Sequence, residues 1–170
     1  MTNKSHTSEI ANRHFQRLAV RRTLGAALLL ALTVLAVPVR AELPAAVTEA
    51  LTSSKYVYLA STRKDGALSK PAEIWFLYHQ GAVYVGTPPT TWRVRRIKAG
   101  RPQAKIWVGK PDGPAFLARG EIVKDPALEQ LLLDTYAKKY PDGWARYEEK
   151  FRTGFKDGSR LLVKYTPSGN

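Results

Sequence analysis

The 170-residue chain contains no cysteine, only three histidines and one methionine. The absence of cysteine excludes disulfide bonds, thiolate metal ligands and thiol chemistry, although it names no compartment by itself. Two of the histidines, His6 and His14, lie in the first segment, so the rest of the chain holds only His79 and has no ligand set typical of zinc. No Gly-x-Ser-x-Gly elbow or Walker loop is present, which argues against serine-hydrolase and P-loop chemistry.

Residues 1–41 resemble an export signal more than a part of the fold. A polar, basic stretch precedes the apolar run Thr23–Val37, which is short for a membrane span and suits the apolar region of a signal peptide. The segment ends in VPVRA, so we expect cleavage after Ala41. The pair Arg21-Arg22 is similar to a twin-arginine signal; an ordinary secretory signal and an uncleaved anchor are the alternatives. We therefore expect an exported, periplasmic or otherwise extracytoplasmic protein.

Acidic residues are scarce, and the formal net charge is +13. Residues 1–41 contribute six Lys and Arg and one acid, so the remainder carries 21 basic and 13 acidic residues, a net charge of +8. A nucleic-acid partner would use these cations with Trp92 and Trp107 as stacking groups, but export of the chain argues against it. Attraction of the basic body to a membrane surface would depend on salt. We expect membrane contact through the signal segment only.

The sequence after residue 53 is rich in aromatic and β-branched residues bounded by Gly, Pro and Asp turns. KDG (64–66), HQG (79–81) and KPDGP (110–114) indicate tight turns, so we expect antiparallel neighbours. Runs such as EIWFLY are apolar on both faces, which favours a closed or nearly closed small barrel covered by helices. Six strands are predicted, over Tyr56–Thr62, Glu73–Tyr78, Ala82–Gly86, Ala104–Val108, Ala115–Val123 and Arg160–Tyr165.

Four helical segments interrupt or precede these strands. Cap residues, a proline at a first helical position and apolar spacing of three or four residues mark them. With the strands, they predict one mainly β, α+β domain over residues 42–170. The helices are expected over Pro44–Ser53, from Thr90 or Thr91 to Gly100, from Asp125-Pro126 to a break at Tyr140–Gly143, and as a short helix around Trp144, Tyr147 and Phe151.

The stretch YVGTPPTTWRVRRIKAGRP, residues 84–102, places a group of cations after a hydroxyl-rich turn. On a short helix Arg93 and Arg96 share one side, while Arg95 and Lys98 project about a third of a turn away, so the cations cannot all reach one phosphate. A strand that ends in threonines and opens into a helix nonetheless favours a small phosphate site that an Arg side chain completes. A solvated basic face is the alternative for each cation.

STRKDGALSKPAEIWF and VYVGTPPTTWRVRRIKAGRP follow an order of strand, DG turn, strand, turn, strand and short basic helix. This order resembles the flavin-binding split β-barrels related to pyridoxamine 5'-phosphate oxidase and their deazaflavin-dependent relatives. The similarity covers roughly residues 50–167. It implies a six-stranded antiparallel split β-barrel with flanking helices, a homodimer, and FMN as cofactor, with coenzyme F420 or haem as alternatives.

The resemblance also implies a set of residues that bind the cofactor. The phosphate cation at the start of the second strand corresponds to Lys70, the hydroxyl after the third strand to Thr87, the capping hydroxyl to Thr91 and the helix cation to Arg93, with Arg95 or Arg96 as neighbours. The ring system would lie along Glu73–Trp75 and Val85–Pro88 near a subunit interface. Trp75 and Ala115 depart from the oxidase, which has lysine and glutamine there, so pyridoxamine phosphate oxidation is not expected.

Two hypotheses for function follow. The first is an exported, homodimeric oxidoreductase that binds FMN or a deazaflavin and passes a hydride to or from a small substrate, with the cofactor carrying the chemistry. No side chain is singled out as a catalytic acid or base. The second is a non-catalytic carrier of haem or of the cofactor on the same fold. His79 is conceivable as a haem ligand, although a single turn histidine is more often simply exposed.

Overall fold

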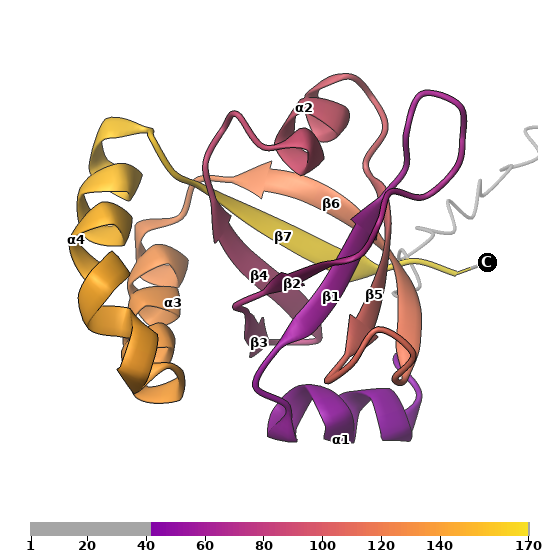
Figure 1. Cartoon of the computed structure of the whole chain (residues 1–170), viewed down its shortest axis with the longest axis horizontal. Helices are drawn as coiled ribbons and strands as arrows, with labels where there is room; N and C mark the ends of the chain where they lie inside the picture. The colour runs from indigo at the N-terminus through magenta and orange to yellow at the C-terminus, as the bar shows by residue number, and fades with distance from the viewer. Residues whose placement is uncertain (1–41, 170) are drawn as a thin grey trace, which may run out of the picture. The chain divides into compact units, whose positions relative to one another are not determined.

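The computed structural model describes residues 42–169, and the predicted export signal lies outside this range. Seven antiparallel strands form one curled sheet, a half-barrel in the order β2-β1-β5-β6-β7-β4-β3, with four helices around it (Figure 1). The strands are β1 (Val57–Ser61), β2 (Ala72–Ile74), β3 (Leu77–His79), β4 (Ala82–Thr87), β5 (Gln103–Val108), β6 (Ala115–Val123) and β7 (Leu161–Pro167). The helices are α1 (Ala45–Ser53), α2 (Trp92–Lys98), α3 (Pro126–Lys139) and α4 (Pro141–Asp157).

The prediction of one strand over Glu73–Tyr78 is wrong, because this run forms two strands and the sheet has seven strands in place of six. β2 pairs with β1 at one edge of the sheet, whereas β3 pairs with β4 at the other edge. Trp75 and Phe76 carry the chain from the first edge to the second, which requires the sheet to curl (Figure 1). The Phe76 side chain is fully buried at this crossover.

The three predicted hairpins are confirmed. β1 and β2 pair across the KDG turn, β3 and β4 across HQG, and β5 and β6 across KPDGP. Gln80 and Gly81 both have positive φ, at 47° and 70°, which is the backbone of a two-residue type I′ hairpin. This turn sets the register in which His79 lies opposite Ala82.

The sheet is buried on both faces, as the apolar runs predicted. On β7, Leu162 belongs to a cluster under α3 and α4, while its neighbour Val163 belongs to the cluster inside the curled sheet. The inner cluster is closed at one end by α1 through Val47 and Leu51. No helix within residues 42–169 has the length and apolar character needed to cross a membrane.

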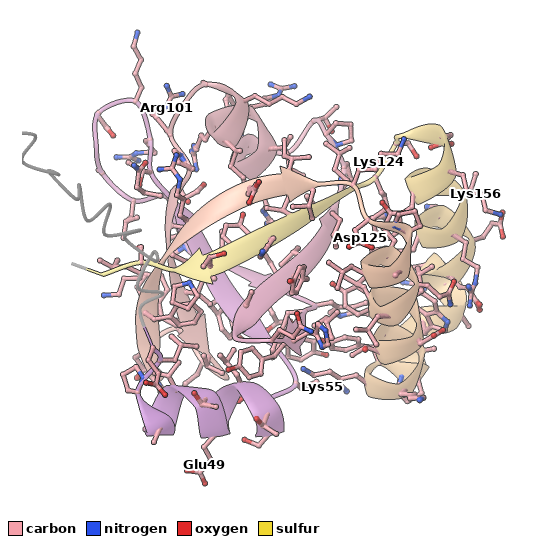
Figure 2. The ribbon with its side chains drawn as sticks, turned by 180° about the vertical axis from the view of Figure 1, so that it is seen from behind. Glu49, Lys55, Arg101, Lys124, Asp125 and Lys156 are labelled. Carbon is pink, nitrogen blue, oxygen red and sulfur yellow. The ribbon has the colours of Figure 1, made fainter. Side chains whose placement is uncertain are left out.

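The third and fourth helices meet at a tight corner. Asp125 caps α3 as predicted, because its side chain accepts hydrogen bonds from the backbone N–H groups of Ala127 and Leu128 (Figure 2). The predicted break after α3 is the corner at Tyr140, which ends α3 and directly precedes α4. The predicted short helix is therefore longer than expected, with 17 residues in α4.

Two tyrosine hydroxyls from the end of α3 hold the crossover between β2 and β3. The Tyr136 hydroxyl donates to the Trp75 carbonyl at 2.7 Å. The Phe76 N–H donates to the Tyr140 hydroxyl at 2.9 Å, and that hydroxyl donates to the Lys55 carbonyl at 2.8 Å. A buried backbone group without a partner destabilises a fold by about 1–3 kcal/mol. The hydroxyls therefore replace the strand partners that the crossover lacks.

Burial of tyrosine hydroxyls predicts a loss of stability at alkaline pH. Desolvation raises the pKa of Tyr136 and Tyr140, and raises the pKa of Tyr165 to about 12. Because the unfolded chain releases these protons near pH 10, their contribution to stability is complete below pH 10 and is lost progressively above it, with the contribution of Tyr165 lost through about pH 12. We expect the free energy of unfolding to fall over this window. Tyrosinate absorbance recorded with circular dichroism tests this, and ionisation of all eight tyrosines before unfolding would contradict it.

Candidate functional site

A pocket of about 300 Å³ opens between the end of β2, β4, the first turn of α2 and α4. Two of the residues predicted to bind a cofactor, Trp75 and Arg93, contribute to it, together with a second cation and the aromatic face of α4. It is lined by Glu73, Ile74, Trp75, Gly86, Arg93, Tyr147, Phe151 and Arg160.

Gly86 allows α4 to lie close to β4 at this pocket. A Cβ atom at this position would lie 2.8 Å from Cε1 of Phe151 and 3.1 Å from Cζ of Phe155. Because Gly86 has no side chain, the aromatic rings of α4 pack directly against β4, and the Phe151 ring lines the pocket there. Sequence reasoning placed Gly86 at the end of a strand but could not predict that a helix packs on it.

Trp75 is fixed by stacking on the residues that also hold the crossover. Its ring centroid lies 4.4 Å from that of Tyr140, with the ring planes 3° apart, and Tyr136 meets it edge-on at 5.6 Å. The indole is therefore held rigidly on one side while it lines the pocket on another. The Phe151 ring lies parallel to the Trp75 ring at a centroid distance of 6.4 Å and Tyr147 meets it edge-on at 5.8 Å, so aromatic rings bound this side of the pocket.

Arg93 is a half-buried cation without a counter-charge. Among the described residues it forms no ion pair and no hydrogen bond, and burial lowers the pKa of its guanidinium. The titratable groups near enough to act on it are the hydroxyls of Tyr165 and Tyr136. The Tyr165 hydroxyl is buried and has no hydrogen-bond partner in this part of the chain. A desolvated guanidinium of this kind is stabilised by an anionic group, so the residues present fit a phosphate-bearing ligand.

Arg160, immediately before β7, places a second guanidinium at the pocket. Its Cζ lies 3.8 Å from the centroid of the Phe151 ring, and its Nε donates to the Lys150 carbonyl at 3.1 Å. Like Arg93, it has no ion pair within residues 42–169. Sequence reasoning used Arg160 only as the start of the last strand, because a cation after a turn is too common to indicate a site.

The two predicted threonines lie together, and neither is among the residues that line the pocket. The Oγ1 atoms of Thr87 and Thr91 are 3.2 Å apart, and the Thr87 side chain is buried. Thr91 stands at the N-cap position of α2, but its side chain makes no capping hydrogen bond and donates to the Pro88 carbonyl at 2.9 Å. The prediction of a capping hydroxyl is therefore wrong, although the residue is where the prediction placed it.

The other predicted cations do not line the pocket. Arg96 donates to the Ser61 Oγ at 2.6 Å and to the Ser61 carbonyl at 3.2 Å. Arg95 is exposed, with its guanidinium carbon 5.2 Å from the centroid of the Trp92 ring. Lys70 is exposed shortly before β2. Of the predicted cations on α2, Arg93 lines the pocket, Arg96 contacts the end of β1 and Arg95 is exposed to solvent.

A larger groove of about 680 Å³ lies between the end of α1 and the corner of α3 and α4. It contains Lys55, Lys138 and Lys139, and burial lowers the pKa of Lys139 to about 8. The Lys139 Nζ lies 3.4 Å from the centroid of the Phe76 ring, which offers it a cation–π partner. Lys138 and Lys139 also complement the C-terminal dipole of α3. Because these cations have local roles, the smaller pocket is the better candidate site.

His79 lies half-buried in β3 and is not among the residues that line the candidate pocket. Within residues 42–169, no three His, Asp or Glu side chains are grouped so that they could hold a metal ion.

No protein-family model matches the chain, and no curated protein matches it in sequence. Solved structures match it in fold. The conserved hypothetical protein Rv2991 from Mycobacterium tuberculosis is 15% identical with a TM-score of 0.57, over 76% of this chain and 83% of that one. A candidate pyridoxamine 5'-phosphate oxidase from Listeria innocua is 13% identical with a TM-score of 0.52, over 72% of this chain and 91% of that one.

HutZ, a haem storage protein from Vibrio cholerae, is 16% identical with a TM-score of 0.52, over 76% of this chain and 93% of that one. Similarities at this level of identity show a common fold. The resemblance to pyridoxamine 5'-phosphate oxidase-like split barrels is therefore confirmed for the fold, with the seventh strand as the correction.

Proposed function

We propose that the protein is an exported oxidoreductase that binds FMN or a deazaflavin and transfers a hydride to or from a small substrate. The observation that carries the proposal is Arg93, a half-buried cation without a counter-charge in a pocket that Trp75 also lines. The family resemblance assigns the phosphate cation to the same position. A fold shared with a candidate pyridoxamine 5'-phosphate oxidase supports this reading.

In this proposal, Arg93 binds the phosphate group, and the hydroxyls of Thr87 and Thr91, which lie 3.2 Å apart, are its further partners, as the family resemblance implies. Trp75 and Phe151 orient the ring system and exclude water from one side of it. Arg160 supplies a second positive charge at the pocket. The bound cofactor would supply the hydride chemistry, which no side chain of the pocket can provide.

A pocket of about 300 Å³ is at the lower limit of small-molecule sites. Since the pocket is open to solvent, a second copy of the chain could supply the missing walls. We therefore retain the homodimer as part of the proposal. Sedimentation of the cofactor-loaded protein measures its oligomeric state. A monomer that retains its cofactor would contradict the homodimer.

A carrier of haem on the same fold is the second candidate, favoured by the similarity to HutZ. His79 lies away from the candidate pocket, so haem bound there would need an axial ligand of another kind. The two candidates therefore differ in an observable way, because haem and flavin have different visible spectra.

The visible absorption spectrum of the protein purified after export, with mass spectrometry of the released ligand and of the intact chain, tests the proposal. We expect a flavin or deazaflavin spectrum and a chain that begins at Glu42. A haem spectrum would move the function to haem binding. A colourless protein that also fails to bind added FMN and coenzyme F420 would overturn the assignment of the pocket, and an intact mass that includes residues 1–41 would contradict cleavage.

A further inference from the structure

The positive charge of the body of the chain is concentrated in two short segments. Residues 62–70 contain three Lys and Arg, and residues 92–102 contain five, with Asp65 as the one acid between them. The remainder of residues 42–170 has 13 basic and 12 acidic residues and is nearly neutral. The net charge of +8 therefore belongs almost entirely to these two segments.

The fold brings the two segments to the same end of the sheet, which we name the basic end. Arg96 of α2 is hydrogen-bonded to Ser61 at the end of β1, and the Thr62 N–H donates to the Gln103 carbonyl at 3.0 Å, just after the second segment. The β1–β2 loop and α2 project side by side from the half-barrel (Figure 1). Figure 2 shows Arg101 at this end, with Lys156 far from it on α4.

The cations of the basic end are nearly all unpaired. Arg63 forms an ion pair with Asp65 at 3.0 Å, and none of the others has an acidic partner within residues 42–169. A surface that only needs to be soluble intersperses both signs of charge. Like charges gathered on adjacent elements repel each other, and an anionic partner relieves this repulsion.

Two apolar side chains are exposed among these cations. Trp92 on α2 is 67% exposed and Leu68 on the β1–β2 loop is 40% exposed. The guanidinium carbons of Arg95 and Arg96 lie 5.2 and 5.9 Å from the centroid of the Trp92 ring. A tryptophan surrounded by Lys and Arg suits the headgroup layer of a bilayer, where the ring is partly dehydrated and the cations meet phosphates.

We propose that the basic end is a docking surface for anionic phospholipid bilayers, with Trp92 and Leu68 entering the headgroup layer. The surface projects outward, as contact with a flat bilayer requires (Figure 1). Single-stranded nucleic acid would instead need several stacking rings along one groove. Trp107 cannot serve as the second ring, because it lies toward the opposite end of β5, paired with Tyr58 and Ala115.

The test measures sedimentation of the protein together with lipid vesicles. It uses the full chain as its own host produces it. We expect binding to phosphatidylglycerol vesicles, little binding to phosphatidylcholine vesicles, and release as salt rises. Replacing Lys64 and Lys98 by Gln should weaken binding about 25-fold, or about fivefold for each cation. The matched control, Lys138→Gln with Lys156→Gln, removes the same charge from α3 and α4 and should leave binding nearly unchanged.

Attachment through residues 1–41 is distinguished by a local measurement. Lipids with brominated chains should quench the fluorescence of the wild type more than that of Trp92→Phe, because Trp92 is the ring at the bilayer. Equal losses in the two charge variants, or no quenching of Trp92, would overturn the proposal. Tighter binding to single-stranded RNA than to anionic vesicles at the same salt would also overturn it in favour of nucleic acid.

Discussion

Replacing Tyr140 by Phe is expected to lower the free energy of unfolding by about 3 kcal/mol. The change removes one oxygen atom, which accepts the hydrogen bond from the Phe76 N–H and donates to the Lys55 carbonyl. The Phe76 N–H would then lack a partner at the crossover, where the side chain of Phe76 has no exposed surface, and the Lys55 carbonyl before β1 would lose its donor. Chemical denaturation followed by circular dichroism gives the value directly.

Tyr147→Phe is the matched control for this prediction. It removes the same atom from a neighbouring aromatic residue whose hydroxyl has no hydrogen bond within residues 42–169. We expect a change of less than about 0.5 kcal/mol, typical of a surface substitution. If Tyr140→Phe changed the free energy of unfolding equally little, water or a shifted backbone would have to provide a hydrogen-bond partner for the Phe76 N–H. The Tyr140 hydroxyl would then not be what holds the crossover.

The elements of the fold that could be predicted from the sequence are those with local causes. The Asp125 cap and the Gln80-Gly81 turn depend on residues within a few positions, and both were predicted in place. The division of Glu73–Tyr78 into β2 and β3 has a distant cause, because the hydroxyls that satisfy its backbone come from residues more than 60 positions later. An apolar run has the same pattern whether it is one strand or two.

The candidate site was predictable in part for the same reason. The basic helix was evident from composition, and helical geometry already indicated that its cations cannot all reach one phosphate. It placed Arg93 and Arg96 on one side, whereas Arg93 lines the pocket and Arg96 is hydrogen-bonded to Ser61. The family resemblance pointed to Arg93, but the residues alone did not identify the cation that enters the pocket, because that depends on how α4 packs against Gly86 on β4. Arg160 could not be found at all without the fold, since it meets Arg93 at the pocket only through the position of β7 beside β4.

Replacing Arg93 by Gln is expected to weaken the binding of FMN about 30- to 150-fold, because the phosphate loses a charge-assisted hydrogen bond worth about 2–3 kcal/mol. Riboflavin, which has the same ring system without the phosphate, should bind the wild type and the variant equally. Isothermal titration with the two ligands therefore separates recognition of the phosphate from recognition of the ring.

Arg95→Gln is the control that distinguishes the structure from the sequence prediction. The two arginines are two residues apart on α2, but Arg93 lines the pocket while Arg95 lies exposed against Trp92. The same loss of charge at Arg95 should therefore change FMN affinity by less than about twofold, a difference of about 0.4 kcal/mol. Equal losses in the two variants would mean that the phosphate binds across the outer face of α2. In that case the phosphate site would be the group of cations on α2 as a whole and not the pocket beside Trp75.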